Sequence, residues 1–319
     1  MEFDLRDTVV EFIEHWRGKT GVEYGRLCRW VGINCQRLCD WRKRKGAANR
    51  HNGHVPRRDW LSGDERSAIV AFYLEHCEDG YRRCAYMMID MDIVWAAPST
   101  VYKVLCRAGA IRRSRGKPSR KGKGFDQPLG IHEHWHVDIT YIHVARKHCF
   151  LTTVIDGRSR YIVVSRLTER MEDTDVGIAV QLAHERFPNA RPRVISDNGA
   201  QFVGKEFKEF IGLHGFTHVR TSPHYPQSNG KIERWHKSLK VECIRRKSLT
   251  GLEQAAGVVE AYVDYYNLAR LHSAVGYVTP ADMLAGKADG IHAARDEKLR
   301  LGRERRGLTL EFNGKDAIQ

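Results

Sequence analysis

The stretch that decides the fold runs from Ile195 to Arg234, and it carries an acidic residue near each end. One end reads Ile195-Ser196-Asp197-Asn198-Gly199-Ala200-Gln201-Phe202, and the other reads Ser222-Pro223-His224-Tyr225-Pro226-Gln227-Ser228-Asn229-Gly230-Lys231-Ile232-Glu233-Arg234. Upstream, Trp135-His136-Val137-Asp138-Ile139-Thr140 lies in a segment whose alternating pattern predicts a strand. We therefore predict that three carboxylates, those of Asp138, Asp197 and Glu233, come from three different structural elements.

These three acids are candidate metal ligands. Divalent cations such as Mg²⁺ prefer oxygen ligands and bind through few carboxylates, which leaves room for water and phosphate. Two such ions ~3.5–4 Å apart stabilise both the attacking and the leaving oxygen of an in-line displacement. The structural alternatives are an Asp-Asn-Gly turn at Asp197 and a solvated helix residue at Glu233. A charge in mid-strand at Asp138, however, needs a partner or a metal ion.

With their neighbours, the acids resemble the DDE family of bacterial insertion-sequence transposases, which have a retroviral-integrase-type core. The likeness covers Trp135 to Leu284 closely and the N-terminal third more loosely. The matching residues are Asp138, Ser196-Asp197-Asn198-Gly199, Gln201-Phe202, Pro226 to Arg234, Lys240, Tyr266-Asn267, Arg270, His272, Gly276-Tyr277 and Thr279-Pro280. This resemblance implies a ribonuclease-H-like fold, with Mg²⁺ (or Mn²⁺ in its place) held by Asp138, Asp197 and Glu233. It also implies DNA strand cleavage followed by strand transfer.

The long helix predicted for Gln227 to Arg246 carries the third acid. Its apolar stripe consists of Ile232, Trp235, Leu239 and Cys243. Glu233, Lys237 and Lys240 lie about 100° away on a neighbouring face. The resemblance implies that Lys237 and Lys240 contact DNA phosphate near the scissile bond. The other candidate DNA-binding residues of this region are Asn198, Gln227, Asn229 and Lys231.

The charge of the chain points to a polyanionic partner. The 319 residues carry a net charge of +14 and have an isoelectric point of about 9.5. The excess is uneven, because residues 1–124 hold 25 Lys and Arg against 15 Asp and Glu. No apolar run approaches the ~18 residues of a membrane span. We therefore expect a polyanionic partner and no membrane, and the resemblance implies that this partner is double-stranded DNA, both transposon ends and target.

The N-terminal part is predicted to be helical. Residues 1–50 hold candidate helices at Asp4 to Trp16, Tyr24 to Val31 and Asn34 to Arg44, with Gly32 as a turn. The last two favour a helix-turn-helix with Arg42, Lys43 and Arg44 as DNA contacts, although an ordinary three-helix bundle fits the same pattern. Residues 59–111 are predicted to form a second helix-turn-helix, with Ser62 as a helix cap and a possible wing at Ala110 to Arg112.

A basic segment at residues 112–130 follows. Between Arg112 and Lys123 it has seven Lys and Arg and no acid. Such a segment buries little apolar area, so we expect a solvated linker that also runs along the DNA backbone. Its candidate phosphate contacts are Lys117, Arg120, Lys121 and Lys123.

Residues 131–287 are predicted to form the catalytic core, with three antiparallel strands followed by alternating helices and strands. This order is the one expected of a ribonuclease-H-like sheet. Residues 288–319 are expected to be a charged C-terminal tail, with a peripheral helix at Ala288 to Arg306 and a short strand at Leu308 to Phe312. The predicted fold class is therefore α+β multidomain, with all-α helix-turn-helix modules followed by a mixed sheet with helices.

The eight cysteines follow no disulfide framework, so free thiols in a reducing cytoplasm are expected. Cys35-x3-Cys39 followed by His51-x2-His54 loosely resembles a zinc site. Cysteines four residues apart on one helix, however, can both face its core. We therefore expect no zinc.

The sequence predicts a DNA transposase that binds transposon ends, cleaves and joins DNA strands, and assembles as a dimer or tetramer on DNA, in the cytoplasm. A transposase-derived regulator that binds DNA without catalysis is an alternative, which the intact acids disfavour. A nuclease of the same fold is another, which the two helix-turn-helix modules disfavour.

Overall fold

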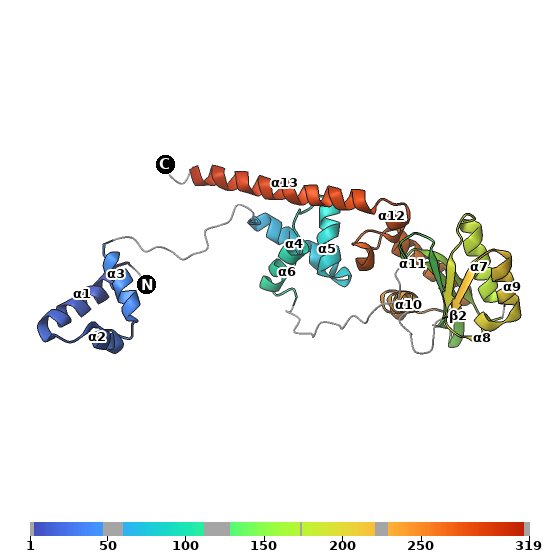
Figure 1. Cartoon of the computed structure of the whole chain (residues 1–319), viewed down its shortest axis with the longest axis horizontal. Coiled ribbons are helices and arrows are strands. Elements are labelled where there is room, and N and C mark those ends of the chain that lie inside the picture. Colours follow the sequence, from blue (N-terminus) through green and yellow to red (C-terminus); the bar gives the residue numbers. More distant parts are fainter. Residues whose placement is uncertain (1–2, 47–59, 112–127, 173, 221–228, 316–319) are drawn as a thin grey trace. The chain divides into compact units, whose positions relative to one another are not determined.

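The computed structural model describes residues 3–46, 60–111, 128–172, 174–220 and 229–315 (Figure 1). It divides into two compact units, Met1–Arg57 and Arg58–Gln319. The basic segment, with Lys117, Arg120, Lys121 and Lys123, lies outside the described residues. In the part of the chain that is described, no helix is both long and apolar enough to cross a membrane.

The first unit is a three-helix arrangement of α1 (Phe3–Thr20), α2 (Tyr24–Val31) and α3 (Cys35–Lys43). Gly32 ends α2 in the left-handed region, at φ 75°, and the Asn34 side chain caps α3 by accepting from the Gln36 amide at 2.9 Å. The small core consists of Val10, Ile13, Leu27, Cys28 and Leu38.

The cysteine pattern of this unit corrects one expectation. Cys35 and Cys39 are both exposed, so the prediction that they face the helix core was wrong. Leu38 occupies the buried face of α3 instead, because it meets the core residues of α1 and α2. His51 and His54 lie outside the described residues.

The second unit begins with three further helices, α4 (Gly63–Glu75), α5 (Gly80–Asp90) and α6 (Pro98–Arg107). Ser62 and Glu65 form a reciprocal capping box at the start of α4, as the sequence pattern predicted for Ser62. The predicted wing is not a strand at Ala110 and Ile111. These helices pack around a core of Ile69, Phe72, Cys84, Ala85, Met88, Val94, Ala96, Val101, Val104 and Leu105.

A mixed five-stranded sheet follows, in the order β3-β2-β1-β4-β5. The antiparallel strands β1, β2 and β3 form one half, while β4 pairs parallel to β1, and β5 pairs parallel to β4. The strands are β1 (His134–Val144), β2 (Lys147–Asp156), β3 (Ile162–Thr168), β4 (Arg193–Ser196) and β5 (Thr217–Arg220).

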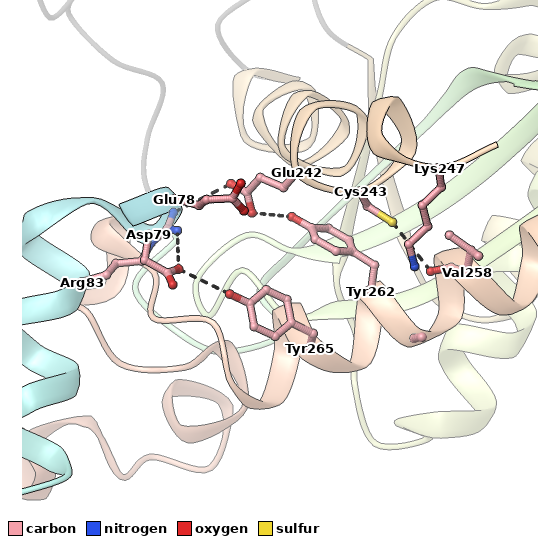
Figure 2. Close-up of a pocket in the computed structure, with 10 residues that line it drawn as sticks. Glu78, Asp79, Arg83, Glu242, Cys243, Lys247, Val258, Tyr262 and Tyr265 are labelled. Atoms are coloured by element: carbon pink, nitrogen blue, oxygen red, sulfur yellow. Dashed lines mark hydrogen bonds and ion pairs between the residues drawn. The ribbon is translucent and has the colours of Figure 1, made fainter. Parts of the chain in front are cut away.

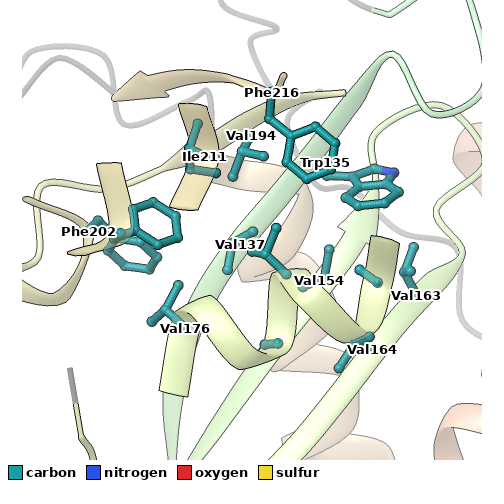
Figure 3. Packing of buried hydrophobic residues seen from close by; sticks show 14 of the residues in the cluster. Trp135, Val137, Val154, Val163, Val164, Val176, Val194, Phe202, Ile211 and Phe216 are labelled. Atoms are coloured by element: carbon teal, nitrogen blue, oxygen red, sulfur yellow. The ribbon is translucent and has the colours of Figure 1, made fainter. Parts of the chain in front are cut away.

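Helices cover the sheet on both faces. On one face, Val137 and Val154 of the sheet pack with Val176 of α7 in a core that also contains Phe202 and Ile211 (Figure 3). On the other face, Ile142 and Leu151 belong to a core with residues of α10 and α11. These helices are α7 (Asp175–Arg186), α8 (Ala200–Val203), α9 (Lys205–Leu213), α10 (Gly230–Glu242) and α11 (Leu252–Leu268).

The chain ends in α12 (Pro280–Leu284) and the long helix α13 (Ala288–Lys315), which runs past α4 and α5 (Figure 1). Ion pairs attach α13, among them Arg295 with Asp90 at 2.6 Å, Lys298 with Asp92 at 2.6 Å and Arg306 with Glu65 at 3.0 Å. The predicted strand at Leu308–Phe312 was wrong, since these residues continue the helix. Short 3₁₀ turns complete the fold at Cys77–Asp79, Ile244–Arg246 and Ser273–Val275.

Candidate active site

The parallel pairing of β1 with β4 brings the first two candidate acids to neighbouring positions. His134 pairs with Arg193 and His136 with Ile195. The same register, continued by one step, sets Asp138 beside Asp197, just beyond the end of β4. Because side chains alternate along a strand, Asp138 lies on the face of His136 and Thr140, opposite to Val137. This face of the sheet is the one covered by α10.

Asp138 sits in a partly desolvated and acidic environment. Its side chain is 19% exposed, and Oδ1 accepts a hydrogen bond from the Ile139 amide at 2.9 Å. The pKa of Asp138 is raised to about 6, mainly by burial and also by the charges of Asp197 and Glu233, against the lowering effect of that hydrogen bond. Both other acids are therefore close enough to act electrostatically on Asp138.

Asp197 is exposed at the start of the loop after β4. Its Oδ1 accepts a hydrogen bond from the Gly199 amide at 2.9 Å, which is the Asp-Asn-Gly turn foreseen as its structural role. A Cβ at position 199 would lie 3.1 Å from that same Oδ1 and from Gln201 Nε2, so this tight turn favours glycine. The turn and a ligand role are compatible, since one oxygen of Asp197 holds the loop.

Glu233 is presented by α10 as the helical pattern predicted. Ile232, Trp235 and Leu239 are fully buried, whereas Glu233 is exposed. The Trp235 indole also donates to Thr153 Oγ1 of β2 at 3.4 Å. The apolar stripe thus fixes α10 against the sheet and leaves the carboxylate of Glu233 at the surface.

Asp138 and Glu233 line a hollow of about 490 Å³, which we call the carboxylate cleft. His236 is a cleft residue that sequence reasoning missed: its Nδ1 lies 3.5 Å from Asp138 Oδ2. Its position three residues after Glu233, on the same helical face, is a signal that could have found it. The cleft is lined by Asp138, Ile139, Thr140, Glu233, His236, Lys237, Lys240, Val241 and Arg245.

The donor set of the cleft suits a hard cation, although the side chains do not form a ready-made cage. Carboxylate oxygens are the ligands that Mg²⁺ prefers. Asp197 and Glu233 raise the pKa of Asp138, and a bound cation would reduce the repulsion between these negative charges. Over the residues with described positions, no three His, Cys, Asp or Glu side chains are arranged to hold a metal ion together.

The predicted lysines differ in their surroundings. Lys240 donates to Thr140 Oγ1 at 2.7 Å, and burial lowers its pKa. Lys237 is exposed at the rim of the cleft. Burial and the charge of Arg160 lower the pKa of Lys231 to about 7. Asn229 is buried with 6% exposure, so its side chain is not offered to the surface.

The other predicted DNA contacts are spread over the chain. Asn198 is exposed in the loop with Asp197, and Gln227 lies outside the described residues. In the first unit, Lys43 is exposed, while Arg42 pairs with Glu14 at 2.8 Å. The Arg44 carbonyl accepts from Arg6 Nη2 at 2.7 Å. Among the candidate DNA contacts that the structure describes, Lys237 and Lys240 line the cleft with Asp138 and Glu233, and Asn198 lies next to Asp197.

The C-terminal end of α10 is held by a second set of charges (Figure 2). Glu242 accepts from Arg270 Nη2 at 2.6 Å and Nε at 2.8 Å, and from the Tyr262 hydroxyl at 2.7 Å. Arg83 of α5 lies 4.0 Å from Glu242 and 3.2 Å from Asp79. These contacts line a pocket of about 310 Å³ between α5, α10 and α11.

Comparison with known proteins places the core in a family. Residues 130–226 match one family model described as "Integrase core domain", and residues 214–280 match a second model of that description. The chain is 27% identical over 175 residues to a transposase for insertion sequence element IS904 of Lactococcus lactis. It is 24% identical over 278 residues to an uncharacterized protein of insertion element IS407 from Burkholderia multivorans.

A third relative, an uncharacterized protein of insertion element IS476 from Xanthomonas euvesicatoria, is 33% identical over 95 residues. The IS904 match covers 51% of this chain and 69% of the IS904 protein. The IS407 match covers 84% of this chain and 93% of the IS407 protein. The IS476 match covers 30% of this chain and 28% of the IS476 protein. This chain therefore spans little more than two thirds of the IS904 transposase and less than a third of the IS476 protein.

Among solved structures, one match is a simian T-cell lymphotropic virus intasome in complex with PP2A regulatory subunit B56 gamma. Its sequence identity to this chain is 15% and the TM-score is 0.46. The match covers 68% of this chain and 74% of that chain. Another is the HTLV-2 integrase catalytic core domain in complex with magnesium, with 15% identity, a TM-score of 0.39, and coverage of 49% and 98%. From its sequence matches, this chain carries an integrase-type core and resembles bacterial insertion-sequence transposases.

Proposed function

We propose that this protein is a DNA transposase that binds the ends of a transposon and performs metal-dependent strand cleavage and strand transfer. The observation that carries the proposal is geometric: Asp138 and Glu233 line the same cleft, and the parallel register of β1 with β4 leads to Asp197 beside Asp138. A raised pKa of Asp138, to which the charges of Asp197 and Glu233 contribute, supports the proposal. Such clustering of carboxylates at a surface cleft is typical of a functional site. The fold proposed for this core is ribonuclease-H-like, on the strand order β3-β2-β1-β4-β5.

In this proposal Asp138, Asp197 and Glu233 hold Mg²⁺, for which Mn²⁺ substitutes. When bound, the cation stabilises the charge of the attacking and leaving oxygens in an in-line phosphoryl displacement. Lys237 and Lys240 bind the phosphates next to the reacting one, and Thr140 positions the Lys240 ammonium through its 2.7 Å hydrogen bond. His236, 3.5 Å from Asp138, positions the carboxylate.

The helical units supply DNA binding in the same proposal. The exposed Lys43 at the end of α3, and the basic segment with Lys117, Arg120, Lys121 and Lys123, provide phosphate contacts. The high net charge of +14 supports a DNA partner. We further propose that a dimer or tetramer of the chain assembles on paired ends and on target DNA, in the cytoplasm at the nucleoid.

The test is incubation of the full chain with duplexes that carry candidate transposon ends, a supercoiled target plasmid, and either Mg²⁺, Mn²⁺ or EDTA. We expect nicked ends and joined end–target products with either metal and none with EDTA. Nicked DNA without joined products would support the nuclease instead. Specific binding of ends without either product would support the regulator.

A further inference from the structure

A second cleft, about 540 Å³ in volume, adjoins the carboxylate cleft along α10. Lys237 and Val241 line both hollows, so the two share one wall. We call the second hollow the basic cleft, because its lining contains six Lys and Arg side chains and one carboxylate, that of Glu242. The six are Arg83, Arg160, Lys231, Arg234, Lys237 and Arg270.

Two of the six cations already have acidic partners. Arg270 binds Glu242 through two nitrogens, at 2.6 and 2.8 Å, and Arg83 pairs with Asp79 at 3.2 Å. For the other four, the structure gives no ion pair with any carboxylate whose position is described. The single acid of the lining is thus occupied, and the basic cleft keeps an excess of positive charge.

Arg160 is the most unusual of these four cations, which have no ion pair in the described part of the chain, although the charge of Asp156 acts on Arg160 and Lys231 from farther away. It lies in the turn between β2 and β3 with a φ of 66°, a region that side chains larger than glycine adopt at an energetic cost. Its Nη1 is buried and has no hydrogen-bond partner within the described ranges, and the same holds for Lys231 Nζ. Buried donors without acceptors are costly, so a ligand with several acceptor oxygens would stabilise both.

Lys231 also belongs to the first turn of α10. This 13-residue helix begins at Gly230, which lines the basic cleft. The first amides of a helix lack intrahelical acceptors and carry partial positive charge, which favours an anion beside them. An arginine guanidinium group, lysine ammonium groups and the free amides of a helix N-terminus are all donors that bind the oxygens of a phosphate group.

We propose that the basic cleft binds backbone phosphates of the DNA strand that also occupies the carboxylate cleft. The inference rests on the proposed function, in which DNA occupies the carboxylate cleft. Because Lys237 lines both hollows, a strand in the carboxylate cleft can continue into the basic cleft. Arg160 and Lys231 hold the phosphate at the floor, and Arg234 and Lys237 hold it at the rim. Contacts to phosphate oxygens carry no sequence information, so this site binds DNA of any sequence.

The test measures binding alone, with the full chain, EDTA and a fluorescein-labelled 30-bp duplex of arbitrary sequence. Fluorescence anisotropy gives Kd over a series of NaCl concentrations. Each phosphate contact contributes ~0.9 to the slope of log Kd against log salt. We expect Arg160→Gln and Arg234→Gln each to reduce the slope by ~0.9. Arg158→Gln is the matched control, because Arg158 is an exposed arginine of the same turn as Arg160 that does not line the cleft.

Thermal unfolding of each variant separates binding from folding. Arg160→Gln removes an unpartnered buried charge, so we expect an unchanged or higher Tm. Arg234→Gln is a surface change on α10 and keeps the test decisive if Arg160→Gln unfolds. Unchanged slopes for Arg234→Gln, or an equal loss for Arg158→Gln, would overturn the inference. A wild type that binds with a steep slope but yields no DNA products in metal would contradict the proposed function and leave this site standing.

Discussion

The two ends of α10 each carry a glutamate, and the two residues have opposite surroundings. Glu242, at the C-terminal end, accepts two hydrogen bonds from Arg270 and one from the Tyr262 hydroxyl, and Figure 2 shows the Tyr262 bond. Glu233, in the first turn, is exposed in a cleft and acts on another acid, Asp138. A carboxylate supplied with donors by its own fold stabilises that fold. One placed beside like charges is instead available to a cation or a substrate.

The same contrast separates two aspartates of the sheet. Asp156, at the end of β2, is fully buried and accepts from the amides of His132, Arg158 and Ser159 and from the Ser159 hydroxyl. Asp138, on β1, accepts one hydrogen bond from the neighbouring Ile139 amide. The contacts of Asp156 thus hold the turn between β2 and β3 and leave it no role as a ligand.

The largest effect expected from this contrast is that of Glu233→Gln. The amide keeps the size and helix propensity of glutamate but loses the negative charge, so cleavage and joining should fall below detection. Because Ile232, Trp235 and Leu239 anchor α10 through a face that does not include Glu233, the Tm should change little. A strand-transfer assay on pre-cleaved ends measures the loss, and a gel shift checks that DNA binding is kept.

Glu253→Gln is the matched control for this variant, since Glu253 is an exposed glutamate in the first turn of α11. Its activity should equal that of the wild type. Near wild-type joining by Glu233→Gln would mean that Glu233 is an ordinary surface residue and that the catalytic acids must be sought elsewhere.

Glu242→Gln should have the next largest effect, on stability rather than chemistry. The change leaves the Arg270 guanidinium, which is 6% exposed, without its counter-charge. We expect a loss of about 2 kcal/mol in the free energy of unfolding, less than the ~3–5 kcal/mol of a fully buried pair, because the Glu242 side chain is 30% exposed. Urea titration measures it. An unchanged midpoint would mean that the pair contributes nothing net.

The pH dependence of the same pair gives a smaller but more specific effect. Burial acts to raise the pKa of Glu242, but the hydrogen bonds and charge of Arg270 outweigh it and lower the pKa below its ordinary value of 4.5. A lowered pKa contributes stability above pH 4.5 that is lost as the pH falls through the folded-state pKa. The stability difference between wild type and Glu242→Gln should therefore be constant from pH 7 to about 5.5 and narrow below pH 4.5. A difference that widens on acidification would contradict this assignment.

Local patterns predicted much of the core. The segment from Trp135 to Thr140 lies in a strand as predicted, and the stripe of Ile232, Trp235 and Leu239 is buried as expected. Alternation and helical spacing report which face of an element is apolar, and here the sheet and α10 bury those faces. The parallel register that sets Asp138 beside Asp197 follows from the fold and is not visible in either strand alone.

Tertiary contacts between distant residues were beyond such patterns. Nothing local marks Glu242 as the partner of Arg270, 28 residues away. On α7, the apolar Ile178 and Leu182 are 41% and 39% exposed, because Val176, Ala179, Val180 and Ala183 form the buried face. At Leu308–Phe312, a short apolar alternation suggested a strand, but α13 continues through it.

The smallest effect is expected at Lys240, where structural and binding roles can be separated. Lys240→Ala removes both an ammonium group of the carboxylate cleft and the 2.7 Å hydrogen bond to Thr140, whereas Thr140→Val removes only that bond. One such hydrogen bond contributes ~1 kcal/mol, so both variants should lose a similar small amount of stability. Only Lys240→Ala should also lower the salt slope of duplex binding, by ~0.9, because it alone removes a charge that neutralises phosphate. Anisotropy over a NaCl series measures this slope. Equal slopes for the two variants would assign Lys240 to the fold and leave phosphate binding in this cleft to Lys237.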